Sequence, residues 1–75
     1  MATAQHNIKN TLVENIKCYR EKAHLTQEQA AERAGITAKY WQRLEMRSQI
    51  DLPSIKVLFK IAQALNINPG KLIDN

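Results

Sequence analysis

The 75-residue sequence has few residues that crosslink or interrupt a chain: one cysteine, two glycines, two prolines and two histidines. A single cysteine cannot form an internal disulfide, and with two distant histidines it offers no metal-binding spacing. No apolar run approaches the roughly 20 residues that a membrane-spanning helix needs. Residues 1–7 lack the basic start and apolar stretch of a signal peptide. We therefore expect a cytoplasmic chain, held together by packing alone, with no metal, cofactor or membrane partner.

Strand signals are also absent, and the hydrophobic spacing is helical almost throughout. Ile8, Leu12, Ile16, Tyr19 and Ala23 are three or four residues apart, so they share one face of a helix. This spacing predicts a helix over residues 9–23. We expect residues 1–7 to be a flexible tail and residues 8–75 to form a single domain, because so short a chain can hold only one core.

Capping residues mark two short helices in the middle of the chain. Thr26 followed by Gln29 has the spacing of a capping box, in which each side chain bonds to the other residue's backbone. This predicts a helix from residue 27 to about 34, ended by Gly35, which tolerates the left-handed conformation after a helix. Thr37 has the character of the next N-cap, opening a helix over residues 38–46.

The rest of the sequence predicts a polar, irregular segment at residues 47–51, followed by two further helices. Pro53 suits a first helical turn. Asn68 is expected to cap a short last helix that begins at Pro69 and carries Leu72 and Ile73 inward. The expected inner stripe of the longer helix is Ile55, Leu58, Ile61, Ala62 and Leu65. The predicted fold is all-α with five helices.

The helix expected at 38–46 has a divided surface. Its inner side holds Tyr40, Trp41, Leu44 and Glu45, and its outer side holds Ala38, Lys39, Gln42, Arg43 and Met46. Lysine and arginine can donate to guanine O6 and N7, and glutamine can pair bidentately with adenine, so this outer side suits a major groove. The alternatives are solvated charges at Lys39 and Arg43, and a stacking platform for single strands at Tyr40 and Trp41. The position of Trp41 beside Leu44 favours the core for the indole.

The sequence resembles the Cro/repressor-type (Xre-like) helix-turn-helix family. The segments that carry the resemblance are Leu25-Thr26-Gln27-Glu28-Gln29-Ala30-Ala31, Gly35-Ile36-Thr37 and Trp41-Gln42-Arg43-Leu44-Glu45. The resemblance implies a compact, repressor-like DNA-binding domain of five helices, in which helices two and three form the helix-turn-helix and helix three enters the major groove. It favours DNA contact at Lys39 and Arg43 over solvated charges.

The resemblance also implies residue roles. Base contacts are expected at Ala38, Lys39, Gln42 and Arg43. Contacts to the DNA backbone are expected at Gln27, Thr37, Tyr40, Arg47, Ser48 and Gln49. Arg20 and Glu45 match a structural salt bridge that joins the first helix to the end of the third.

The chain departs from the family pattern at three positions: Ala30 stands where a larger aliphatic residue is usual, Trp41 where an aliphatic is usual, and Arg47 where glycine is frequent. Our hypothesis is that the first two departures compensate each other, because a large indole beside a small methyl group keeps the core volume constant. Arg47 leaves open both the path of the loop after helix three and its phosphate contacts.

The surplus of apolar residues around the longer C-terminal helix predicts a dimer patch at Ile50, Leu52, Val57, Phe59, Ile67 and Ile73. The sequence thus predicts a small homodimeric transcriptional regulator, nucleoid-associated when bound to a palindromic operator in double-stranded DNA. It is expected not to be an enzyme and to take no small-molecule substrate. The short form resembles the controller proteins of restriction–modification systems, and also small phage repressors and antitoxins. The alternatives are a protein-interaction module on a helix-turn-helix fold, and a nonspecific nucleoid binder.

Overall fold

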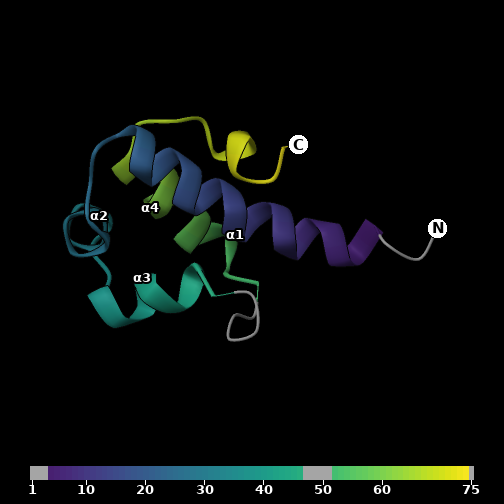
Figure 1. Cartoon of the computed structure of the whole chain (residues 1–75), viewed down its shortest axis with the longest axis horizontal. Coiled ribbons are helices and arrows are strands. Elements are labelled where there is room, and N and C mark those ends of the chain that lie inside the picture. Colours follow the sequence, from purple (N-terminus) through teal and green to yellow (C-terminus); the bar gives the residue numbers. More distant parts are fainter. Residues whose placement is uncertain (1–3, 47–51, 75) are drawn as a thin grey trace.

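A computed structural model describes residues 4–46 and 52–74, with side chains from Ile8 onward. Its elements in chain order are α1 (Ala4–Lys22), α2 (Gln27–Ala34), α3 (Ala38–Leu44), α4 (Ile55–Leu65) and the 3-10 turn η1 (Pro69–Leu72) (Figure 1). The all-α prediction is confirmed for the described residues, but the count of five helices is wrong. The described residues form four α-helices, because the last predicted helix is a single 3-10 turn that opens on Pro69 and Gly70, and glycine disfavours continued helix.

Helix α1 is longer than predicted and projects beyond the other elements at its N-terminal end (Figure 1). It begins at Ala4 rather than at residue 9. Ile8, which was expected on the inner face, is 49% exposed because little lies opposite this end of the helix. Ala23 is also exposed, since it follows the last helical residue. Val13, which the predicted stripe left out, is buried instead.

The predicted caps of the two central helices are confirmed. The Thr26 hydroxyl accepts from the Gln29 backbone N–H at 3.0 Å, and the Gln29 side chain accepts from the Thr26 N–H at 2.9 Å. Gly35 ends α2 in the left-handed conformation, with φ 73°. The Thr37 hydroxyl accepts from the backbone N–H of Tyr40 at 3.0 Å and so caps α3.

Other helix boundaries differ from the predicted ones. Helix α3 ends at Leu44, two residues early, and Glu45 is its C-cap. Ser54 is the N-cap of α4, with its hydroxyl accepting from Val57 N–H at 3.2 Å. Pro53 therefore precedes the helix and is not in its first turn. Ile55, which was expected in the core stripe, is the most exposed large hydrophobic residue described, at 72%.

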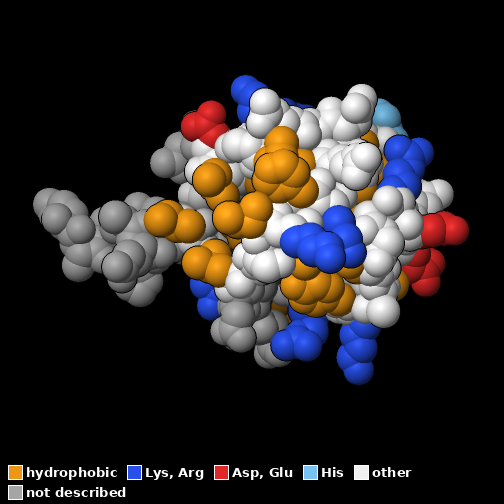
Figure 2. All heavy atoms as spheres, turned by 180° about the vertical axis from the view of Figure 1, so that it is seen from behind, with side chains coloured by type: hydrophobic (Ala, Val, Ile, Leu, Met, Phe, Trp, Pro, Cys, Tyr) orange, Lys and Arg blue, Asp and Glu red, His pale blue; other side chains and the backbone are white. Residues whose placement is uncertain are grey.

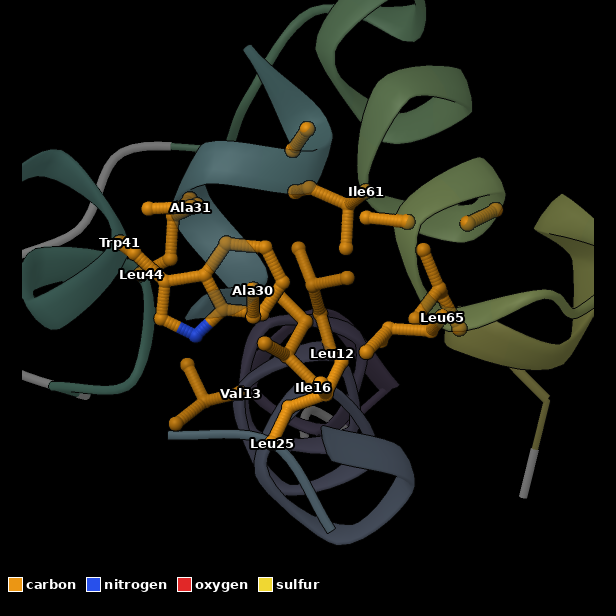
Figure 3. Packing of buried hydrophobic residues seen from close by; sticks show 14 residues of the cluster. Leu12, Val13, Ile16, Leu25, Ala30, Ala31, Trp41, Leu44, Ile61 and Leu65 are labelled. Carbon is orange, nitrogen blue, oxygen red and sulfur yellow. The ribbon is translucent and has the colours of Figure 1, made fainter. Parts of the chain in front are cut away.

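One hydrophobic core joins all the elements. Figure 3 shows the Trp41 indole in the middle of side chains from α1 and α2. The indole and the neighbouring Ala30 are both completely buried, as the volume-conserving hypothesis requires. The buried set is Leu12, Val13, Ile16, Leu25, Ala30, Ala31, Ala34, Trp41, Leu44, Ile61, Ala62, Ala64, Leu65 and Leu72.

The C-terminal segment is held against α1 by one side chain that the sequence analysis did not single out. The Asn15 amide nitrogen lies within hydrogen-bonding distance of three backbone oxygens, those of Lys71 at 3.1 Å, Leu72 at 2.9 Å and Asp74 at 2.9 Å. These contacts occupy carbonyls that a helix end leaves without internal partners. Leu72 is buried beneath them, whereas Ile73, which was also expected to point inward, is 54% exposed.

Candidate nucleic-acid interface

The turn between α2 and α3 fixes the angle at which α3 leaves the core. After Gly35 the chain turns back, and the Ile36 N–H donates to the Ala31 carbonyl at 3.0 Å. Ile36 is half-buried against the core. Thr37 then starts α3, and the two helices pack against each other. This is a helix-turn-helix in which the second helix has one buried face and one free face.

The free face of α3 carries three of the four predicted base-contact residues. Lys39, Gln42 and Arg43 are exposed, whereas Trp41 and Leu44 on the opposite face are fully buried. Ala38 differs from the other three, because it is only partly exposed and packs against the core. Lys39 and Arg43 can donate hydrogen bonds to guanine edges in a major groove, and the Gln42 amide can pair with an adenine edge.

The predicted backbone-contact residues of the described segments lie in different settings. The Thr37 hydroxyl is exposed and accepts from Tyr40 N–H, so its own proton remains to donate. Tyr40 is half-buried against the core. Gln27 is half-buried at the first position of α2. Arg47, Ser48 and Gln49, and Ile50 of the predicted dimer patch, lie outside the described residues.

The Glu45 carboxylate joins three elements. Arg20 from α1 donates through Nε to Oε2 at 2.6 Å and through Nη2 to Oε1 at 3.1 Å, which is the predicted ion pair. Gln27 from α2 donates through Nε2 to Oε1 at 3.0 Å. Trp41 from α3 donates its indole N–H to Oε2 at 2.6 Å. The exposed fractions of the Arg20 and Glu45 side chains are only 12% and 5%.

These donors decide the ionisation of the pair. Burial alone would raise the pKa of the Glu45 carboxyl, but the hydrogen bonds from Arg20, Trp41 and Gln27 outweigh burial and hold that pKa below its ordinary value. The hydrogen bond to Glu45 likewise raises the pKa of the Arg20 guanidinium. Both groups are therefore charged at neutral pH, and neither is poised as an acid or a base.

The Arg20–Glu45 pair was predicted from the sequence, whereas the bonds from Trp41 and Gln27 to Glu45 were not. One signal was available for Trp41, because residues four apart on a helix are neighbours and a buried indole N–H needs an acceptor. No comparable local signal exists for Gln27, which is 18 residues from Glu45. That contact depends on how α2 packs against the end of α3.

A shallow depression brings the predicted contact residues of α2 and α3 onto one surface. It is lined by Lys17, Arg20, Gln27, Gln42, Glu45 and Met46. Gln27, expected at a phosphate, and Gln42, expected at a base, therefore both line this depression. Lys17 of α1 is an exposed cation at this hollow that the sequence analysis did not include.

The predicted dimer patch is only partly a free surface. Leu52, Phe59 and Ile73 are each more than half exposed, but Val57 and Ile67 are half-buried against the core. Figure 2 shows the face on which α4 lies, where exposed hydrophobic side chains gather among lysine and arginine. Ile55 extends this set. A second hollow is lined by Phe59, Ala62, Gln63, Asn66, Ile67 and Pro69.

Within residues 4–46 and 52–74, no three histidine, cysteine, aspartate or glutamate side chains lie close enough together to hold a metal ion. In the same part of the chain, no helix is both long and apolar enough to cross a bilayer.

Comparison with protein families agrees with this geometry. The model of a helix-turn-helix domain family, of Xre-like type, matches residues 13–75, which is most of the chain. The chain therefore belongs to this helix-turn-helix domain family, a class that indicates a DNA-binding regulator. Comparisons with curated proteins and with solved structures gave no match.

Proposed function

We propose that this protein is a sequence-specific transcriptional regulator that binds double-stranded DNA with α3 in the major groove. The observation that carries the proposal is the division of α3, with Lys39, Gln42 and Arg43 exposed on one face and Trp41 and Leu44 buried on the other. Because the buried face fixes the helix, the exposed side chains project from a rigid support, as base readout requires.

The backbone contacts of this proposal come first from the N-terminal ends of α2 and α3. Gln27 stands at the start of α2, where the helix dipole favours a phosphate. The exposed Thr37 hydroxyl can donate to a second phosphate. Arg47, Ser48 and Gln49, which lie outside the described residues, complete the proposed set.

The proposal includes a homodimer that reads a palindromic operator. A single short helix makes few base contacts, whereas a two-fold dimer reads two half-sites about 34 Å apart. The exposed apolar residues on and near α4 supply a surface for that association. The proposed subtype, which rests on the resemblance of the sequence, is a controller protein of a restriction–modification system.

Selection of bound duplexes from a random pool tests the proposal. We expect a palindromic sequence to be enriched, with an affinity that falls steeply with salt because phosphate contacts release counterions. Binding without sequence preference would instead support a nonspecific nucleoid binder. No binding at low salt would contradict the proposal.

The second candidate function is a protein-interaction module, favoured by the exposure of Ile55 and Phe59 on α4. A mobility shift on random duplex DNA at low salt separates the two functions. The interaction module predicts no shift at any salt concentration, whereas the DNA-binding regulator predicts a shift that added salt removes.

A further inference from the structure

We infer that Trp41 is a positioning residue for a DNA backbone contact. Through the carboxylate of Glu45, its indole N–H holds the Gln27 amide in the orientation from which that amide can donate to a phosphate. The inference rests on the proposed function, because the phosphate contact of Gln27 belongs to it. It adds a coupling between the recognition helix α3 and the start of α2.

The first step is the occupancy of the carboxylate. Two carboxylate oxygens offer about four acceptor positions. Oε2 accepts from Arg20 Nε and Trp41 Nε1, and Oε1 accepts from Arg20 Nη2 and Gln27 Nε2. All of these positions are filled, and Trp41 and Gln27 bind opposite oxygens. A rotation of the carboxylate that lengthens one of these bonds therefore disturbs the other.

The second step is what remains on Gln27. A primary amide has two N–H donors. One of them bonds to Glu45 at 3.0 Å, and the other has no hydrogen-bond partner among the described residues. Gln27 also lines the open depression that Gln42 shares. Holding the first N–H therefore orients the second at a surface where a phosphate oxygen can accept it.

The third step is the part played by the indole. Arg20 ties the carboxylate of Glu45, the C-cap of α3, to α1. Trp41 lies one helical turn before Glu45 and ties the same carboxylate back to the body of α3. The base-contact residues Lys39, Gln42 and Arg43 lie on that same helix. The indole N–H therefore sets the position of Gln27 relative to the residues that read bases.

A double-mutant cycle on random duplex DNA tests the coupling at one fixed salt concentration. Two changes remove the indole N–H donor. The first is Trp41→Phe. The second is a synthetic chain with benzothienylalanine at position 41, in which sulfur replaces the indole N–H in a ring of the same shape. We expect either change to weaken binding about three- to tenfold when Gln27 is present and to have almost no effect in the Gln27→Ala background. Equal losses in both backgrounds would overturn the inference.

Tyr19→Phe, which removes a hydroxyl from a half-buried ring on α1, is the matched control and should show no coupling to Gln27.

Hydrogen exchange measured by NMR without DNA separates this inference from the proposed function. In the unmodified protein we expect one Gln27 side-chain proton to exchange slowly and the other quickly, and we expect both to exchange quickly when benzothienylalanine replaces Trp41. Equal exchange in the unmodified protein, or unchanged protection without the indole N–H, would overturn the inference. If the unmodified protein fails to bind DNA, the proposed function fails, but this measurement still decides whether Trp41 positions Gln27.

Discussion

At the scale of single residues, Glu45 is an ionised side chain that accepts hydrogen bonds from residues of three helices. It is almost completely buried, yet it is charged, because Arg20, Gln27 and Trp41 all donate to it. A buried carboxylate is tolerable only when its acceptor positions are filled. Its hydrogen-bond donors come from α1, α2 and α3, so this ionised group lies where the helix-turn-helix packs against α1.

The low pKa of Glu45 predicts a particular acid sensitivity. The folded chain holds the pKa of Glu45 below its ordinary value of 4.5, which applies in the unfolded chain. At a pH between the folded and the unfolded pKa, the unfolded chain binds more protons, so lowering the pH favours unfolding. The ionised Glu45 carboxylate therefore stabilises the fold fully above pH 4.5, and this stabilisation is lost as the pH falls through the pKa of Glu45 in the folded chain. Thermal unfolding followed by circular dichroism across this range should show a falling melting temperature.

Glu45→Gln is the matched variant for this pH dependence. We expect it to be less stable than the parent at neutral pH, since it leaves the Arg20 charge without its partner. Its melting temperature should depend less on pH below 4.5, because the variant lacks the titrating group. Parallel pH profiles for the two proteins would show that other carboxyls cause the acid sensitivity.

The pairing of Trp41 with Ala30 remains a hypothesis about core volume, and both residues are fully buried. Trp41→Ile should leave a void and destabilise the fold by about 2–4 kcal/mol. Adding Ala30→Leu should recover the packing part of that loss but not the hydrogen bond to Glu45. Urea unfolding measures both. A double variant no more stable than Trp41→Ile alone would refute the hypothesis.

At the scale of elements, local chemistry predicted the caps on either side of the α2–α3 turn, whereas other helix boundaries and some buried positions were predicted wrongly. Thr26, Gly35 and Thr37 cap their helices as expected, because a cap depends on residues within one turn of it. Ile8 and Ile55 have the correct helical spacing but are exposed. Periodicity gives the face of a helix but not how far the rest of the fold extends along it.

The turn between α2 and α3 makes an element-scale prediction. Gly35 has φ 73°, and a Cβ added there would meet nothing within 4 Å. Gly35→Ala should therefore destabilise the protein by about 1–2 kcal/mol through backbone conformation alone. Gly70→Ala is the control, because that glycine lacks a positive φ and its Cβ would make an ordinary contact at 3.6 Å with Asn68 Oδ1. Chemical denaturation that shows equal losses for both would contradict this account of the turn.

At the scale of the whole molecule, the family match over residues 13–75 agrees with the sequence-based assignment of a helix-turn-helix. The Arg20–Glu45 pair was predictable by resemblance. The contacts from Gln27 to Glu45 and from Asn15 to the C-terminal carbonyls were not, because they join residues 18 and more than 50 positions apart. Such contacts depend on the packed arrangement of helices, which no local pattern in this sequence encodes.

The proposed homodimer makes a prediction about the exposed apolar face. Phe59 is 58% exposed on α4, and an aromatic side chain at the centre of an interface can supply a large share of the binding energy. Phe59→Ser should weaken self-association by about 30-fold or more while leaving the helicity unchanged. Sedimentation equilibrium measures the association. A parent protein that is monomeric at all concentrations would rule out this dimer.

The most direct test of the central claim, that the free face of α3 reads DNA, is the affinity of Arg43→Ala for the selected duplex. We expect a loss of about 1–3 kcal/mol with unchanged helicity. Arg33→Ala removes the same charge from an exposed position in the last turn of α2, outside the proposed base-contact set, and should cost clearly less. If Arg43→Ala binds as tightly as the parent, or no more weakly than Arg33→Ala, α3 is not the reading helix.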